Sequence, residues 1–499
     1  MGSRMYACGL PIPLFSSQRN QHQPPIMASL TIRNLSITPL ELKSVERFEA
    51  DAVPGPGGFA NITANATSTI KGLLNPITRS PKPGLVAKSV DAHDRHDPNL
   101  RVDPFTTHAT EIRSADPGRE VIRLTFEEPD SGGKQYQVDI PGPSPRSLTL
   151  TRLNGAEKEF TAIYVPTGAF LALMSSANLS QWMHEIRDDL PISVLSLPGT
   201  HNSPTCHVAL PSVRCQAVGV KQQLASGVRF LDIRVNCSAD DEDLTLVHSV
   251  FPISLTGTKR LDADLFKDVY EFLDQNKSET VLISLKREGP GKGTDDRFGR
   301  ILHDNPRYLG GDNARRWFTE PRIPNLGEVR GRIVLVRRFG LEEGLKQENG
   351  GGGWGVDASA WPDNCEDAPT GSGLVRVQDF YEITESTNIQ KKIDLCRKLL
   401  EKSGECRFTG GSPPLFVNFL SASNFFNASC WPERIAAKVN PAMVEYLCMR
   451  HGEDHKGPNG LACGDCATGI VVTDWVGHDG DWDLIGCIVG WNARLQLKQ

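Results

Sequence analysis

The sequence lacks the features of several large classes of protein. It contains no run of about 18 apolar residues, the length that a membrane-spanning helix requires. It also lacks an excess of positive charge, because 54 lysines and arginines stand against 60 acidic residues and give a net charge of -6. We therefore expect no membrane-spanning helix and no nucleic-acid partner, although this balance is compatible with one basic pocket for a phosphate group.

A regular cysteine framework and a clear secretion signal are also missing. The 12 cysteines are irregularly spaced over 499 residues, so their pattern predicts no set of disulfides. The N-terminal segment 1–27 has only a short apolar stretch, which Pro11 and Pro13 interrupt. We expect residues 1–27 to form a disordered leader. We expect the protein to be cytoplasmic or peripheral to a membrane, with secretion left open.

The composition is that of a folded protein, with 39% hydrophobic and 23% charged residues. A length of 499 residues exceeds one ordinary domain of about 150 residues, so two or three domains are expected. Residues 28–168 contain short, half-alternating apolar segments separated by Gly, Pro, Asp and Ser. This pattern predicts an N-terminal all-β domain that resembles a sandwich.

Residues 169–499 show a different pattern, in which apolar runs are separated by helical stretches. Residues 171–186 are predicted to form a helix, and eight strand candidates follow. Eight strands with interleaved helices predict a (β/α)8 barrel of the TIM type. The gap between the second and third candidates is too short for a helix, so we expect an irregular barrel. The candidates are ISVLSL, VRFLDIRV, LTLVHS, ETVLISLK, RIVLVRR, LVRVQDF, LFVNFLS and GIVVTDW.

Two histidines lie at the ends of predicted strands. His201 follows the first strand candidate, and His248 lies in the third. Barrels place their chemistry at strand ends, and an imidazole can hold or release a proton near neutral pH. Asp232 and Arg234, between the histidines, add a carboxylate and a fixed cation. This combination suits cleavage of a phosphate diester by a general base and a general acid.

The motifs around these residues resemble the phosphatidylinositol-specific phospholipase C family, and its bacterial-type, metal-independent branch most closely. The resemblance runs from about residue 190 to the C-terminus and follows the family's order of motifs. It implies cleavage of phosphatidylinositol, a lipid of membranes, into diacylglycerol and inositol 1,2-cyclic phosphate. The matching segments are LPGTHNS, GVRFLDIR, LVHS, ETVLISLKRE, GRIVLVRRF, WPDN, QDFY, VNFLSA and VVTDW.

The resemblance implies a role for each matching residue. His201 would be the general base for the inositol 2-hydroxyl, and His248 the general acid for the departing diacylglycerol oxygen. Asp474 would orient His201. Arg234 would hold the phosphate, and Asp232 would orient Arg234 or His248. Positions that match the pocket for the inositol ring are Lys286, Glu288, Arg338, Trp361, Asp363, Asp379 and Tyr381.

The resemblance also bears on metal use. Calcium-dependent relatives have acidic ligands where this chain has Arg234 and Lys286, and calcium prefers clustered oxygen ligands. Asn202 and Asp232 alone are too few, so we expect no metal and no other cofactor. Asn202 also departs from the bacterial pattern, which has an Asp there; this departure bears on the efficiency of catalysis more than on the reaction.

Plainer interpretations stand beside these assignments. Asp474 could cap a helix and Trp361 could be ordinary core. A second set of metal-ligand types, Cys448, His451, Cys463 and Cys466, has the pair spacings of a structural zinc site, but a metal-free loop is the favoured interpretation. Trp475, Trp482 and Trp491 could form a membrane-contacting rim, although packing on the barrel is favoured.

Two other functions stay open from the sequence. A glycerophosphodiester phosphodiesterase would share the barrel and the two histidines, but it needs an acidic metal site, and Arg234 speaks against one. A non-catalytic phosphoinositide-binding protein would keep the pocket without the reaction. The presence of His201, His248 and Asp474 favours the enzyme.

Overall fold

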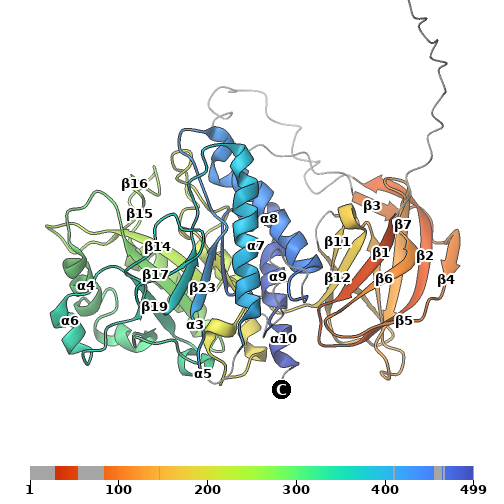
Figure 1. The fold of residues 1–499 in the computed structure, drawn as a ribbon, viewed down its shortest axis with the longest axis horizontal. Helices are drawn as coiled ribbons and strands as arrows, with labels where there is room; N and C mark the ends of the chain where they lie inside the picture. The colour runs from red at the N-terminus through yellow and green to blue at the C-terminus, as the bar shows by residue number, and fades with distance from the viewer. Residues whose placement is uncertain are drawn as a thin grey trace, which may run out of the picture.

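The computed structural model describes residues 28–53, 84–144, 147–407, 411–453, 464 and 467–497. The predicted leader, 1–27, therefore lies outside the described residues. A mostly antiparallel β region at one end adjoins a mixed region of parallel strands and helices (Figure 1). Among the helices of the described ranges, none is long and apolar enough to cross a membrane.

The N-terminal region contains two sheets, as the all-β prediction requires. Their apolar side chains form one shared core, which includes Ile32 and Leu171 from one sheet and Val45 and Leu124 from the other. The sheets therefore face each other across that core. One sheet has the order β6 (Thr106–Arg113), β1 (Ser29–Asn34), β12 (Phe170–Ser175), β11 (Phe160–Val165) and β9 (Leu148–Thr149). The other has β10 (Thr151–Leu153), β8 (Gln135–Ile140), β7 (Glu120–Glu127), β2 (Leu40–Val53) and β3 (Gly84–Ala87), with β4 (Asp94–His96) and β5 (Leu100–Val102) also paired to β2.

The helix predicted over 171–186 is wrong. Phe170–Ser175 forms strand β12, which pairs with β1 and β11, and only a short 3-10 turn follows at Trp182–Glu185. Leu171 and Leu173 face the core between the two sheets, whereas Ala172 and Met174 pack on helices of the second region. A strand buried on both faces loses its polar alternation, which explains the error. The sheets thus extend past residue 168 to Ser175.

The second region is built on a curled, largely parallel sheet flanked by helices (Figure 1). Several of its strands are almost continuously apolar, as in Ile470–Thr473, because both of their faces are buried. This mixed α/β architecture is consistent with a distorted barrel. The strand order is β18 (Trp317–Phe318), β19 (Ile333–Arg338), β17 (Val281–Arg287), β14 (Phe230–Asn236), β13 (Leu197–Thr200), β24 (Ile470–Thr473), β23 (Leu415–Phe419), β22 (Val375–Gln378) and β21 (Ala368–Pro369), with β20 (Val356–Asp357) beside β19.

The helices follow or precede these strands along the chain. Helices α7, α8 and α9 lie between the parallel strands and the N-terminal sheets (Figure 1). The described helices are α2 (Val220–Ala225), α3 (Lys267–Gln275), α4 (Asp295–Asp304), α5 (Leu326–Val329), α6 (Glu343–Glu348), α7 (Ile389–Glu405), α8 (Pro432–Met449), α9 (Asp483–Gly490) and α10 (Ala493–Gln496).

Two of the eight predicted barrel strands differ from expectation. The third, LTLVHS, forms β15 (Thr245–His248), which runs antiparallel to β14 and to β16 (Phe251–Pro252). A parallel neighbour needs a crossover of a dozen or more residues, and the link 237–244 is shorter than that. The first candidate begins with a 3-10 turn at Ile192–Val194, so its strand starts only at Leu197.

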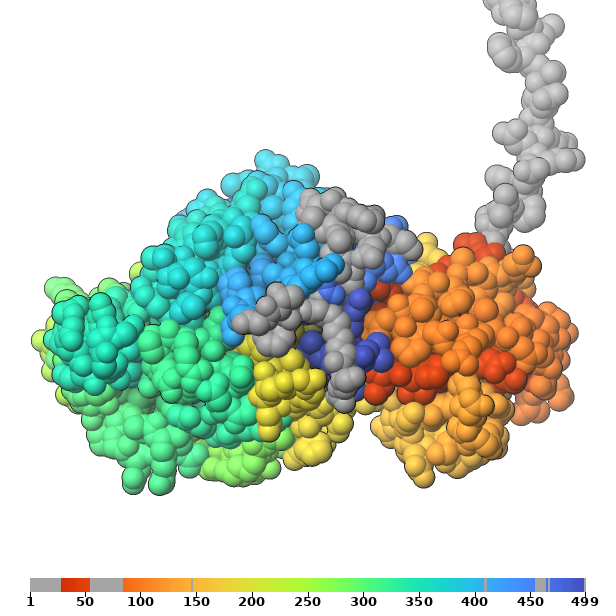
Figure 2. All heavy atoms as spheres, turned by 60° about the horizontal axis from the view of Figure 1, so that its bottom comes forward, coloured from red at the N-terminus to blue at the C-terminus, as the bar shows by residue number. Residues whose placement is uncertain are grey.

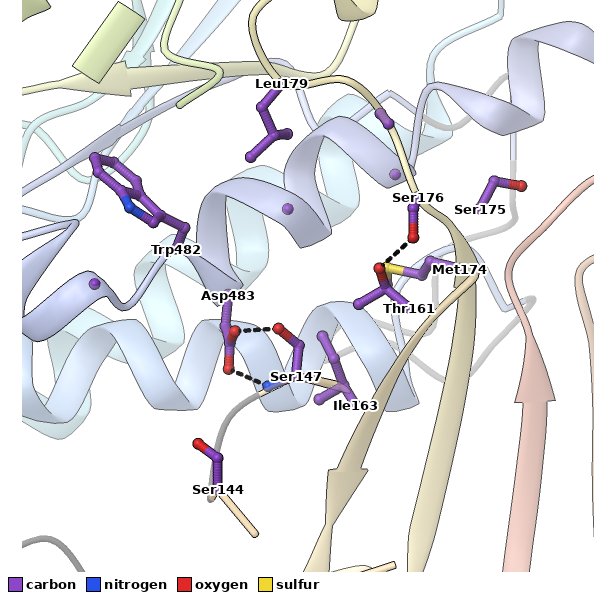
Figure 3. Close-up of a pocket in the computed structure, with 14 residues that line it drawn as sticks. Ser144, Ser147, Thr161, Ile163, Met174, Ser175, Ser176, Leu179, Trp482 and Asp483 are labelled. Atoms are coloured by element: carbon purple, nitrogen blue, oxygen red, sulfur yellow. Dashed lines mark hydrogen bonds between the residues drawn. The ribbon is translucent and has the colours of Figure 1, made fainter. Parts of the chain in front are cut away.

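The N-terminal sheets are joined to the second region by specific contacts. The Arg33 guanidinium of β1 donates hydrogen bonds to the carbonyl oxygens of Cys448, in the last turn of α8, and of His451, just after that helix. Ser147 donates from its amide and its hydroxyl to Asp483 at the start of α9 (Figure 3). The C-terminal residues, dark blue in Figure 2, lie against the red N-terminal strands. The two regions therefore share an extensive junction.

Candidate active site

The first histidine is positioned by two neighbouring parallel strands. Strands β13 and β24 pair so that Thr200 lies opposite Thr473. The next residue of each strand is His201 and Asp474, so the register alone brings these two side chains together. The Nδ1 atom of His201 lies 3.0 Å from Oδ1 of Asp474. Both side chains are buried.

This pairing determines how His201 can act. A carboxylate at Nδ1 keeps the proton on that nitrogen and leaves Nε2 as the basic atom. Burial raises the pKa of Asp474, and the nearby His201 acts in the opposite direction. The amide of Gln216 donates to the carbonyl oxygens of His201 and Thr473, which fixes the backbone behind the pair.

The second histidine faces the first. The ring centroids of His201 and His248 are 5.6 Å apart, with the ring planes 85° from parallel. Nδ1 of His248 lies 2.8 Å from the carbonyl oxygen of Val213, so it is the donor in that hydrogen bond. Burial lowers the pKa of His248, and the charges of Arg234 and His201 lower it further. Without an anion beside it, His248 is therefore neutral.

A row of cations lies across three adjacent parallel strands. The register of β14, β17 and β19 places Arg234 opposite Lys286, and Lys286 opposite Arg338. Glu288 balances two of them, because it accepts from Lys286 at 3.2 Å and lies 3.6 Å from Arg234. The row lies at the carboxyl ends of the strands, where a parallel sheet presents its ligand-binding groups.

Asp232 is the fully buried carboxylate among these cations. It accepts hydrogen bonds from the backbone amide of Asn202, from Nε of Arg234 at 3.3 Å and from Arg338 at 3.2 Å. Burial acts to raise the pKa of Asp232, but Arg234 and Arg338 overcome that effect and hold it well below its ordinary value. The structure thus connects Asp232 to Arg234, as predicted, and to Arg338 as well.

The remaining predicted residues form a wall next to Arg338, at one end of the cation row. The guanidinium carbon of Arg338 lies 3.6 Å from the centroid of the Trp361 ring, a cation–π contact. The indole N–H of Trp361 donates to Asp379 at 2.9 Å. The hydroxyl of Tyr381 donates to Asp363 at 3.1 Å. Trp361 is therefore a bridge between charged side chains rather than plain core.

Asn202 has an unusual environment. Its backbone lies in the left-handed region, with φ of 39°, and its side-chain N–H donates to the carbonyl of Val247, next to His248. The side chain therefore links the turn at His201 to the strand end at His248. Its Oδ1 is buried and has no hydrogen-bond partner within the described part of the chain.

Comparisons with known proteins agree with this geometry. Residues 189–339 match the family model for the phosphatidylinositol-specific phospholipase C X domain, and this segment carries His201, His248 and the cation row. Residues 189–339 therefore carry the X domain of this family. The resemblance that we inferred from the motifs is thereby confirmed.

Individual relatives of the X domain are distant. A 1-phosphatidylinositol phosphodiesterase of Staphylococcus aureus is 26% identical over 354 residues, which is 66% of this chain and 96% of that protein. The corresponding protein of Listeria monocytogenes is 27% identical over 196 residues, 35% of this chain and 58% of its own length. A solved structure of the F249X mutant of the S. aureus phosphatidylinositol-specific phospholipase C is 25% identical, covers 63% of this chain and 98% of that chain, and has a TM-score of 0.48.

Sequence reasoning about the X domain missed the contribution of the segment between β13 and α2. This segment supplies Gln216, the carbonyl of Val213 and the buried thiol of Cys215, which lies 3.6 Å from Nδ1 of His248. Burial raises the pKa of Cys215 well above its ordinary value. These residues have no periodic or motif signal, so only the three-dimensional structure places them at the site.

Two other features lie away from the X-domain histidines. A cavity of about 290 Å³ lies at the junction between the N-terminal sheets and α9, where Trp482 and Asp483 contribute to its lining (Figure 3). Of the residues considered for a structural zinc site, Cys463 and Cys466 lie outside the described residues. Sγ of Cys448 is 3.9 Å from Sγ of Cys487, and the His451 ring packs on Trp491. The choice between a zinc site and the favoured metal-free loop therefore stays untested.

The environment of His248 predicts an unusual titration. In the free protein the ring should stay neutral at about pH 5, where a histidine with the ordinary pKa of about 6.5 is mostly protonated. An inositol phosphate bound beside Arg234 adds negative charge and should raise the pKa of His248. Nitrogen NMR of protein labelled at histidine measures both values, with His248→Gln to assign the signal. A free-protein pKa near 6.5, or one that does not respond to the ligand, would contradict this description.

Proposed function

We propose that this protein cleaves phosphatidylinositol into diacylglycerol and inositol 1,2-cyclic phosphate without calcium. The observation that carries the proposal is the arrangement of the two histidines. His201 is paired with Asp474, and its ring centroid lies 5.6 Å from that of His248. The charge of Arg234 acts on His248 from close by. Family membership supports the phosphodiesterase class. The base, acid and cation assignments come from the family resemblance, and the geometry of His201, His248 and Arg234 supports them.

In the proposed reaction, His201 and His248 work on opposite sides of one phosphorus atom. Nε2 of His201 accepts the proton of the inositol 2-hydroxyl, and that oxygen forms a bond to phosphorus. The bond from phosphorus to the diacylglycerol oxygen breaks, and His248 protonates the departing oxygen. Because nucleophile and phosphorus belong to the same molecule, the step avoids most of the entropic cost of a bimolecular attack.

The negative charge of the substrate explains how His248 becomes an acid. Burial and, after it, the positive charge of Arg234 lower the pKa of His248 in the free protein, and a phosphate diester next to Arg234 offsets the second of these effects. Binding of substrate therefore loads His248 with the proton that it later donates. Arg234 also offers a fork of donors to the phosphate oxygens, on which charge increases in the transition state.

This wall and the neighbouring Lys286 suit an inositol ring. The hydroxyls of the ring need both donors and acceptors, which Lys286 and the carboxylates of Asp363 and Asp379 supply. The guanidinium of Arg338 stacks on the ring of Trp361 in the protein without substrate, and this contact fixes the wall before substrate binds. We propose that it orients the 2-hydroxyl toward His201.

Independence from calcium follows from the charges around Asp232. Calcium takes six to eight oxygen ligands, and carboxylates are its preferred type. Both oxygens of Asp232 already accept hydrogen bonds from guanidinium groups, and Lys286 lies in the same row. A divalent cation at this position would have to displace these cations.

An apolar rim supports contact with a membrane. The rim consists of exposed side chains on the segments that follow β13, β15 and β23, the strands whose ends carry or adjoin the histidines. Phe251 stacks on Phe425, which joins two of these segments. We propose that the rim inserts among lipid headgroups while the histidines reach the substrate. The rim residues are Val208, Leu210, Val250, Leu255, Phe425 and Phe426.

The tryptophans considered for this purpose do not make such a rim. Trp491 is buried against His451 at the junction with the N-terminal sheets, so a surface role for it is wrong. Trp482 contributes to the lining of the cavity beside α9 (Figure 3). Trp475 is half-buried under the guanidinium of Arg214.

Removing the proposed base or its partner should stop turnover. In the presence of excess chelator, His201→Ala should lose on the order of 10³-fold or more in kcat, because general base catalysis contributes about 10²–10⁴-fold. Asp474→Asn should lose about 10²-fold, since it no longer fixes the tautomer of His201. The rate of diacylglycerol release from phosphatidylinositol vesicles measures both effects. The control is His207→Ala, a half-buried histidine of the same segment.

Retained turnover in His201→Ala would show that the base is assigned incorrectly. Binding of phosphatidylinositol vesicles without turnover in any preparation would favour the non-catalytic alternative. Faster hydrolysis of glycerophosphoinositol than of the intact lipid would favour the glycerophosphodiesterase.

Polar substitutions in the rim should separate membrane binding from chemistry. Val250→Ser and Phe426→Ser should each weaken binding to phosphatidylinositol vesicles by about 10-fold, from the lost apolar burial. Cleavage of a monomeric, short-chain phosphatidylinositol should stay unchanged. Co-sedimentation with vesicles measures binding, and Val90→Ser, 92% exposed on the N-terminal sheets, is the control. Equal loss of binding in the Val90 variant would contradict the rim.

A further inference from the structure

A third side chain with metal-ligating chemistry lies beside the two histidines. Cys215 comes from the segment between β13 and α2 and is completely buried. Its backbone amide donates to Thr205, and its carbonyl accepts from the amide of Trp475, so both of its backbone groups are held. The proposed reaction assigns no task to its thiol.

The three side chains converge closely enough to share an ion. One ligand atom from each of His201, Cys215 and His248 lies within 4.8 Å of the other two. Zinc binds sulfur at about 2.3 Å and nitrogen at about 2.0 Å in a tetrahedron, which separates ligand atoms by about 3.5 Å. If side-chain rotation moves the ligand atoms by on the order of 1 Å, they reach the separation that a bound ion requires.

The groups behind the ligands are those of protein metal sites. Metal-bound histidines typically donate their other ring N–H to a carboxylate or a backbone carbonyl. Here Asp474 stands behind His201, and the carbonyl of Val213 stands behind His248. His201 can thus present Nε2 to an ion without losing its hydrogen bond to Asp474. The thiol of Cys215 lies 3.6 Å from Nδ1 of His248, so His248 binds the same ion either by releasing the Val213 carbonyl or by turning its ring to present Nε2.

The ligand set selects the kind of ion. One thiolate and two imidazoles suit zinc and similar borderline or soft ions, whereas calcium and magnesium need oxygen ligands. When the ion binds, a sulfur–metal bond forms and the thiol proton passes to the solvent. Asp232, Asp474 and Glu288 offset the repulsion that Arg234 exerts on the cation.

We propose that His201, Cys215 and His248 form a binding site for zinc and that the bound ion switches off the enzyme. The ion occupies the lone pairs that the base and the acid need, so catalysis and metal binding exclude each other. The inhibition rests on the proposed function, whereas the binding of the metal does not. Cys215 gives the active site a sensitivity to zinc that two histidines alone would not provide.

Cobalt serves as the spectroscopic probe, because a cobalt–thiolate bond gives a charge-transfer absorption. The full-length protein titrated with Co²⁺ should develop this band, and zinc should displace it. Cys215→Ser should lose the band. Cys206→Ser, a half-buried thiol of the same segment, should keep it. A protein without the band, or an unchanged band in Cys215→Ser, would overturn the proposal.

Inhibition of vesicle cleavage by zinc gives the second measurement. Measured against its own rate without metal, Cys215→Ser should need at least about 100-fold more zinc for half-inhibition than the wild type. Loss of a group that only supports a metal ligand costs about 10- to 100-fold in metal affinity. Equal sensitivity to zinc in the wild type and the variant would overturn the switch. A cobalt band that depends on Cys215 in a protein without lipid cleavage would support the metal site and count against the proposed function alone.

Discussion

The buried carboxylate of Asp232 is the interaction on which the cationic side of the site depends. Two guanidinium groups, Arg234 and Arg338, lie close to it and would repel each other without a charge between them. A buried ion pair of this kind contributes little net stability, but removing one partner leaves an uncompensated buried charge. Asp232 also accepts the amide of Asn202, so the same carboxylate anchors the turn that carries His201.

Parallel register brings the rest of the site to this carboxylate. The pairing of β13 with β24 sets His201 beside Asp474, and the pairing of β14, β17 and β19 aligns Arg234, Lys286 and Arg338. Strand β15 pairs antiparallel with β14, and its last residue, His248, lies next to His201. Each catalytic candidate thus comes from the end of a buried strand, where packing limits its movement.

Much of this arrangement could be predicted from the sequence. The buried parallel strands appear as continuous apolar runs, and the polar residues at their ends mark the site because strand ends meet at one edge of a sheet. Three elements differ from their predictions, and the first strand candidate does so only in that a 3-10 turn precedes it. Strand β12 is apolar on both faces and therefore looked helical, and the direction of β15 depends on the length of the link before it. Cys215 and Gln216 could not be predicted, because an irregular segment has no periodicity that places its side chains.

The central claim concerns a product, so identification of the product tests it most directly. Phosphorus NMR can follow intact phosphatidylinositol vesicles mixed with the protein and excess chelator. With the wild-type protein, we expect the signal of inositol 1,2-cyclic phosphate to appear first. With His201→Ala, we expect the lipid signal to stay unchanged. Release of inositol 1-phosphate with no cyclic compound at early times, or activity only after calcium is added, would contradict it.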